Sequence, residues 1–172
     1  MAIPGRILLI LFTGLFLWSC DQSRKSESDN ADVTNSVITD QPVIKDPVTG
    51  YIQLKDALIS SDKEAGKNAG MNFKLVVTGN VDAAFEKALL SVTDKIITSS
   101  DIEEQRKYFE QVSELMYALA QNGQFEGQRI YKQFCPMAFN NKGAFWLSLD
   151  ENILNPYFGE SMLRCGYVEE IL

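Results

Sequence analysis

The chain has 172 residues, a formal net charge of −7 and no histidine. The lack of histidine excludes Ser-His-Asp and Cys-His catalytic groups and every histidine metal site. An acidic chain without a cluster of Lys and Arg is poorly suited to nucleic acid, whose binding depends on neutralising phosphates. These facts favour a protein that is not an enzyme and binds no nucleic acid. Any metal has to be held by sulfur, carboxylate or carbonyl groups.

The first twenty residues predict export and lipidation. Arg6 precedes an apolar stretch over 7–17, which is shorter than the roughly 20 residues of a membrane-spanning helix. This length and charge order are typical of an export signal. Residues 17–20 (LWSC) resemble the bacterial lipobox, which implies that residues 1–19 are a cleaved signal peptide and that Cys20 carries a diacylglyceryl group. The alternative is an ordinary signal peptide followed by a cysteine without lipid.

Residues 20–50 are predicted to be a lipidated cysteine and a disordered tether. The stretch is rich in small polar and charged residues and has few large apolar ones, so it buries too little surface to fold. A flexible chain of this length reaches about 30 Å. Removal of residues 1–19 takes away Arg6 and changes the net charge from −7 to −8. We therefore expect the lipid to hold the protein at a membrane of the cell envelope, facing the periplasm.

Residues 51–172 are predicted to form a single helical domain, since about 120 residues are enough to bury a core. Apolar side chains at helical spacing predict four helices joined by short turns, which is typical of an up-and-down bundle. The four apolar stripes run over 51–58, 65–73, 84–96 and 102–119.

The predicted helix ends carry recognisable signals. Ser61 with Glu64 and Ser100 with Glu103 have the spacing of capping boxes, in which a side-chain oxygen accepts a free backbone N–H. Asn122-Gly123 is typical of a helix C-terminus, because glycine readily adopts a left-handed conformation there.

Residues 124–172 lose the helical periodicity and gather aromatic residues, two cysteines and two methionines. Short extended segments are expected at 129–134 and 144–149, and a helical turn at 159–165. The predicted fold class is therefore mainly α, a small four-helix up-and-down bundle with an irregular Cys/Met/aromatic-rich C-terminal segment packed on it.

Two sulfur pairs in this segment are candidate metal ligands. If Pro136 keeps the chain extended, Cys135 and Met137 share one face, and Met162 and Cys165 share one face of a helical turn. If the two pairs meet, they form a site of two thiolates and two thioethers. Such soft ligands favour Cu(I) over hard cations.

The alternative for the same residues is a disulfide without metal. In an oxidising compartment, with Cys20 lipidated, Cys135 and Cys165 are an even pair of cysteines. Their disulfide closes a loop of about 30 residues and stabilises it by about 2–4 kcal/mol. Met137 and Met162 are then packing residues beside aromatic rings. The residues alone leave both interpretations open, including that they are two states of one redox-sensitive site.

Several stretches, most of them C-terminal, resemble a known family, the domain of unknown function numbered 3347. These stretches are DIEEQRKYF (101–109), YKQFCPMA (131–138), GAFWLS (143–148), NPYFG (155–159) and MLRCG (162–166). The resemblance spans roughly Tyr51 to Val168, weakly over the first helices and specifically over the last 45 or so residues. Relatives often carry His or Tyr before the motif cysteine, where this chain has Phe134.

The resemblance implies a helical, periplasm-facing domain, since the family occurs in Gram-negative lipoproteins and in periplasmic adaptors of copper and silver efflux pumps. The sequence-based hypothesis is therefore a membrane-anchored lipoprotein that binds Cu(I) through Cys135 and Cys165, assisted by Met137 and Met162. It buffers the ion or delivers it to a heavy-metal efflux adaptor or pump. The alternative function is a protein-interaction module of the envelope, stapled by a Cys135–Cys165 disulfide.

Overall fold

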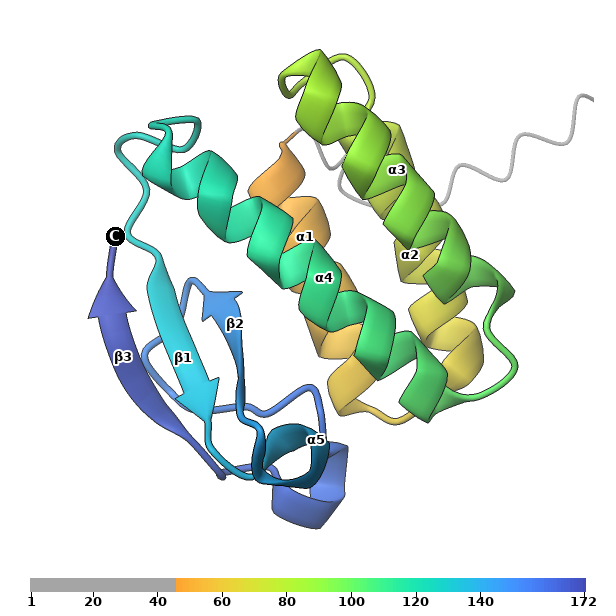
Figure 1. Ribbon diagram of the computed structural model, residues 1–172, viewed down its shortest axis with the longest axis vertical. Coiled ribbons are helices and arrows are strands. Elements are labelled where there is room, and N and C mark those ends of the chain that lie inside the picture. Colours follow the sequence, from red (N-terminus) through yellow and green to blue (C-terminus); the bar gives the residue numbers. More distant parts are fainter. Residues whose placement is uncertain (1–45) are drawn as a thin grey trace, which may run out of the picture. The chain divides into compact units, whose positions relative to one another are not determined.

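The computed structural model describes residues 46–172, in which four long helices are followed by a small sheet (Figure 1). The elements, in order, are α1 (Pro47–Ile59), α2 (Lys63–Val77), α3 (Ala83–Thr98), α4 (Ile102–Gln121), β1 (Tyr131–Cys135), the short α5 (Ala138–Asn141), β2 (Ala144–Ser148), the 3-10 helix η1 (Gly159–Met162) and β3 (Tyr167–Ile171). The predicted mainly α fold class is confirmed. The predicted signal at 1–19, Cys20 and the tether as far as residue 45 lie outside the described residues.

The four long helices pack as a bundle around a continuous apolar core. Neighbouring helices in the chain contact one another, and α1 also contacts α4. Their largest fully buried side chains are Tyr51, Leu54, Leu58, Phe73, Leu89, Ile96, Phe109 and Met116. In α1, α3 and α4 these residues recur at helical spacing in the sequence, so the period of the apolar pattern specifies which face is buried. In α2 the buried face also includes Gly66 and Gly70, which the apolar pattern does not indicate.

The start of α1 corrects the boundary of the predicted tether. Residues 47–50 are helical rather than disordered, with Asp46 as N-cap and Pro47 in the first turn. Proline favours this position because its fixed φ fits the helix and its missing N–H is not needed there. Gly50 is buried where a Cβ atom would lie 2.4 Å from Val76 Cγ2, so the absence of a side chain lets α1 approach α2.

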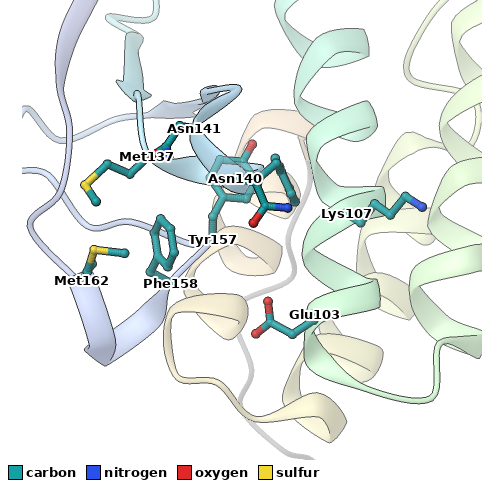
Figure 2. A pocket seen from close by; sticks show the side chains of 9 residues that line it. Glu103, Lys107, Met137, Asn140, Asn141, Tyr157, Phe158 and Met162 are labelled. Atoms are coloured by element: carbon teal, nitrogen blue, oxygen red, sulfur yellow. The ribbon is translucent and has the colours of Figure 1, made fainter.

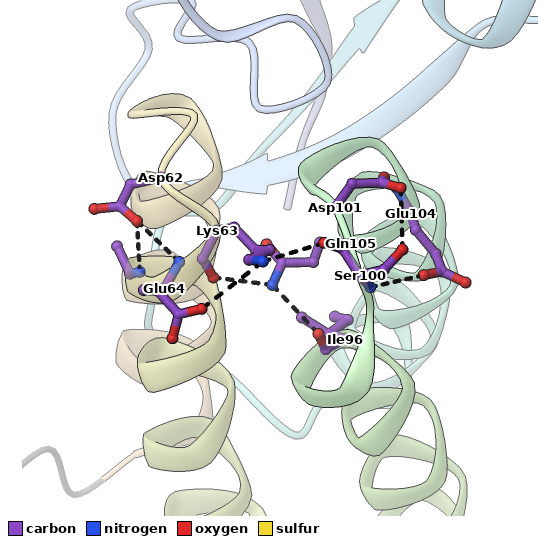
Figure 3. Close-up of polar contacts among 9 residues, drawn as sticks. Asp62, Lys63, Glu64, Ile96, Ser100, Asp101, Glu104 and Gln105 are labelled. Carbon is purple, nitrogen blue, oxygen red and sulfur yellow. Dashed lines mark hydrogen bonds and ion pairs between the residues drawn. The ribbon is translucent and has the colours of Figure 1, made fainter.

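Aspartates, rather than the predicted serines, cap α2 and α4. The Asp62 carboxylate accepts the N–H groups of Glu64 and Ala65, and Asp101 accepts that of Glu104 (Figure 3). The prediction of Ser61 and Ser100 as caps was wrong by one residue. Each serine directly precedes an aspartate, whose carboxylate is a stronger acceptor and complements the positive helix end.

Gln105 connects three helices within the bundle. Its Nε2 donates to the carbonyl oxygens of Lys63, at 3.0 Å, and Ile96, at 3.3 Å, so one α4 side chain joins the start of α2 to the end of α3 (Figure 3). A Cβ atom on Gly66 would lie 2.5 Å from Gln105 Oε1. Gly66, which weakens α2 by its intrinsic propensity, therefore makes room for this connection.

The C-terminal segment is a sheet rather than an irregular wrap. Its three antiparallel strands have the order β2-β1-β3, and β2 contacts α4. The extended segments predicted at 129–134 and 144–149 are confirmed as β1 and β2. The third strand was missed because its residues are mostly exposed and lack an apolar alternation. The third strand is recognised only from its hydrogen-bonded pairing with β1.

Among residues 46–172, no helix combines the length and the apolar character needed to cross a bilayer.

Candidate functional site

The two C-terminal cysteines meet at the end of the sheet. Cys135 is the last residue of β1, and Cys165 lies in the loop that leads into β3. Their Sγ atoms are 3.0 Å apart and both residues are thiols. Cys135 is fully buried, whereas Cys165 is partly exposed. The antiparallel pairing of β1 with β3 brings together two residues that are thirty positions apart.

The loop that carries Cys165 is fixed by backbone hydrogen bonds. The Cys165 N–H donates to the Met162 carbonyl at 3.0 Å, and Asn155 Nδ2 donates to the Cys165 carbonyl at 2.8 Å. At Gly166, with φ 143°, a Cβ atom would lie 2.8 Å from the Phe134 carbonyl oxygen. These contacts hold the Cys165 backbone in one place against the sheet.

The surroundings of Cys165 favour its neutral thiol form. The pKa of Cys165 is raised, first by its hydrogen bond with Cys135, then by desolvation and by the neighbouring sulfur charge. A raised pKa means that the neutral thiol persists to higher pH than in a free cysteine. Metal ions bind the thiolate, so metal binding here has to release protons.

The two methionines lie in the wall of a pocket of about 490 Å³ (Figure 2). The other lining residues are Glu103, Lys107, Phe139, Asn140, Asn141, Tyr157 and Phe158. Met137 is 46% exposed. Figure 2 shows the thioether groups of Met137 and Met162 turned toward each other, with the Phe158 ring beside them. Neither cysteine lines this pocket.

The structure therefore arranges the four predicted sulfur ligands as two pairs. The expectation that Pro136 keeps the chain extended through Met137 was wrong, since Met137 has helical dihedral angles of φ −90° and ψ −10°. This turn leads Met137 to the surface while Cys135 remains in the core. The cysteines meet in the interior, and the methionines meet at the surface pocket.

An unusual turn forms one side of the pocket. Phe139, Asn140 and Asn141 have φ values of 49°, 59° and 66°, so three consecutive residues are left-handed. Each such residue costs about 1–2 kcal/mol, less for asparagine. Gly143 follows with φ 79°, and a Cβ there would lie 2.3 Å from the Phe134 ring. The packing on Phe134 therefore constrains where this turn ends.

Arg106 attaches the C-terminal segment to the bundle and was missed as a site residue. It is buried, and it donates from Nε to the Pro156 carbonyl at 2.9 Å and from Nη2 to the Leu58 carbonyl at 3.1 Å. It also pairs with Glu103 at the edge of the pocket. In the sequence, Arg106 lies between Ile102 and Phe109 at the spacing of the buried face of α4. This position was the signal that could have identified Arg106 as a buried residue.

Comparisons with known proteins identify a family but no activity. The family model described as Protein of unknown function (DUF3347) matches residues 48–127. No curated protein and no solved structure matches the chain. The family model covers α1 to α4 and ends before Cys135. It therefore does not include the C-terminal motifs that carried the most specific part of the sequence resemblance. Within residues 46–172, no group of three or more His, Cys, Asp or Glu side chains is arranged to hold a metal.

Proposed function

Because residues 48–127 belong to the DUF3347 family, whose description assigns no function, we propose a function from this chain's own sulfur groups. The protein is a membrane-anchored envelope lipoprotein that binds Cu(I) or a similar soft metal ion as cargo. It buffers the ion or delivers it to an efflux adaptor or pump. Cys135 and Cys165 supply the thiolates, and Met137 and Met162 supply thioethers as a second pair at the neighbouring surface pocket.

The observation that carries this proposal is the 3.0 Å separation of the Cys135 and Cys165 sulfurs. Two thiols that approach one another across a sheet are ready to share one soft ion. Metal–sulfur bonds are about 2.3 Å long in zinc sites, so two sulfurs on one ion at a tetrahedral or linear angle lie farther apart than 3.0 Å. Rotation of Cys165 is the smaller movement, since Cys135 is fully buried.

The lipid anchor and tether give this binding a location. A domain held by Cys20 at a membrane and free to move by about 30 Å can reach partners on the same surface. The acidic charge of the chain favours the approach of cations. The proposal therefore combines local capture of a toxic ion with hand-over to a membrane-bound exporter.

The test uses the full chain purified in detergent. After reduction, it is titrated under nitrogen with Cu(I) against a chromogenic chelator. We expect about one equivalent of competing metal, and a loss of at least about tenfold in affinity for Cys135→Ser. Met71→Leu, a change at an exposed methionine on α2, is the control and should compete like the wild type. Absence of competition, or competition unchanged in Cys135→Ser, rejects the thiolate site.

The same contact favours a second candidate function, a disulfide-stapled interaction module of the envelope. The two sulfurs need only a small approach to form a bond, and Cys135 is protected in the core. Alkylation of protein isolated without reductant, followed by mapping of the modified peptides, separates the candidates. Labelled Cys135 and Cys165 indicate the dithiol. Protection of both until reductant is added indicates the disulfide.

A further inference from the structure

Met137 and Met162 lie together in a pocket that neither cysteine lines. They come from separate turns, one after β1 and one in η1, and both line the same pocket. Met137 is nearly half exposed, although its side chain is apolar and flexible. In Figure 2 the two thioethers face each other instead of packing into the core. A surface pair of this kind leaves sulfur lone pairs open to an incoming ion.

The groups around the pair suit a soft ion better than a hard cation. The Phe158 ring lies beside the thioethers, and an aromatic face attracts a desolvated cation. Hard divalent cations need six or more oxygen ligands or several waters. Besides the amides of Asn140 and Asn141, this pocket offers one carboxylate, Glu103, which already pairs with Arg106. Two thioethers and a ring are a poor site for calcium or magnesium and a favourable one for Ag(I) or Cu(I).

The left-handed turn at 139–141 contributes to the shape of this pocket. Phe139, Asn140 and Asn141 all line the pocket, and their backbone is held in an unfavourable conformation. Conformational strain of this kind persists only where surrounding contacts enforce it, and it is common at binding sites. The turn begins at Phe139, two residues after Met137, so it lies next to that thioether in the chain.

We infer that Met137, Met162 and Phe158 form a separate soft-metal entry site that works whether Cys135 and Cys165 are thiols or a disulfide. This inference deepens the proposed function and rests on it for the identity of the cargo. It does not depend on the thiolates as ligands. Thioethers carry no proton to lose, so binding at the entry site releases none, whereas transfer to the thiol pair does.

The test uses the full chain in detergent with the Cys135–Cys165 disulfide formed and verified by failure to alkylate. The probe is Ag(I), added as its nitrate in chloride-free buffer, and the readouts are calorimetry and the NMR signals of labelled methionine methyl groups. We expect about one equivalent of Ag(I), shifts at the Met137 and Met162 methyls, and affinity that changes less than about twofold between pH 5.5 and 7.5. A thiolate site would lose affinity toward pH 5.5, since free cysteine titrates near 8.5.

Three variants locate the site. Met137→Leu and Met162→Leu each should reduce Ag(I) affinity by about tenfold or more, and Met71→Leu should leave it unchanged. Met137→Leu keeps the volume of an exposed side chain, so loss of folding is not expected. Should the disulfide fail to form, Cys135→Ser combined with Cys165→Ser provides the thiol-free protein for the same titration.

The outcomes distinguish this site from the thiolate site. Absence of Ag(I) binding in both thiol-free forms, or equal binding by all methionine variants, overturns the entry site and leaves the proposed thiolate function standing. Binding that requires Met137 and Met162, in a protein whose reduced form shows no dependence on Cys135, supports the entry site and rejects the thiolate proposal.

Discussion

The helical bundle and the C-terminal sheet are held together by different kinds of contact. In α1 to α4, apolar stripes and capping aspartates recur along the chain, and most contacts join neighbouring helices. The C-terminal segment is held by contacts between residues distant in sequence, such as Cys135 with Cys165 within it and Arg106 of α4 with Pro156. The bundle is thus specified by local pattern, whereas the sheet depends on individual long-range pairs.

The proposed function divides the same two regions. The family match lies on the helices, yet the proposed ligands all lie on or beside the sheet. The bundle acts as the scaffold to which the sulfur-bearing segment is fixed. Substitutions at the residues that join the bundle to the C-terminal segment are therefore the most direct test of how the two regions depend on each other.

The largest effect is expected at Phe109, whose ring contacts both regions. It lies 5.2 Å from the Tyr51 ring in the bundle and 6.0 Å from the Tyr157 ring in the C-terminal segment, measured between centroids. Phe109→Ala should lower the free energy of unfolding by about 3–5 kcal/mol. Helical circular dichroism and the fluorescence of buried Trp146 should melt together. Separate transitions would show that the two regions fold independently.

Gly159 should separate the docking of the sheet from the stability of the bundle. Its φ is 55°, and a Cβ there would lie 2.4 Å from Ser61 Oγ and 2.8 Å from the Ile59 carbonyl oxygen. We expect Gly159→Ala to cost about 2–3 kcal/mol of unfolding free energy and to expose Trp146 to quenchers. Gly127→Ala is the matched control, since its φ is 84° and no atom is near the added methyl. Its cost should be about 1 kcal/mol. Equal costs would contradict the docking role.

Tyr51 forms a polar connection between the two regions. The Ser113 hydroxyl donates to the Phe109 carbonyl, so Tyr51 donates to Ser113 and accepts the Leu147 N–H of β2 at 3.0 Å. Tyr51→Phe leaves that buried N–H without a partner and should cost about 1–3 kcal/mol in denaturant unfolding.

The control for this change is Tyr108→Phe. Tyr108 is only half-buried, and the contact of its ring with the Lys95 ammonium group does not involve the hydroxyl. It should change stability by less than about 0.5 kcal/mol. A loss as large as that of Tyr51→Phe would mean that the Leu147 connection does not matter.

The smallest effect on stability is expected at acid pH, at one carboxylate of the bundle and one beside the sheet. The pKa of Asp101 in the bundle is lowered chiefly by the Glu104 N–H, and that of Asp150 beside the sheet by the Asn152 N–H. A lowered pKa in the folded state gives stability that is present above the unfolded value of about 3.9 and is lost as pH falls through the folded value. Asp101→Asn and Asp150→Asn should therefore each flatten the decline of melting temperature below about pH 4. An unchanged acid limb in both would show that these hydrogen bonds add no stability.

Sequence reasoning succeeded where the physical signal is periodic. The buried faces of α1, α3 and α4, the helix end at Asn122-Gly123 and the positions of β1 and β2 all follow from spacing and turn residues. It failed by one residue at Ser61 and Ser100, since serine and aspartate compete for the cap. It also placed the start of the first helix too late, since the first turn of α1 contains Pro47 and Gly50, which are typical of loops.

The sequence by itself determined the helical class, the family and the sulfur residues, because residue type and helical period are local properties of the chain. Only the tertiary structure decided that Cys135 meets Cys165 and that Met137 and Met162 line a pocket of their own. The register of β1 on β3 and the turn at Met137 set these distances. The register arises from contacts between residues far apart in the chain, on which the local pattern carries no information.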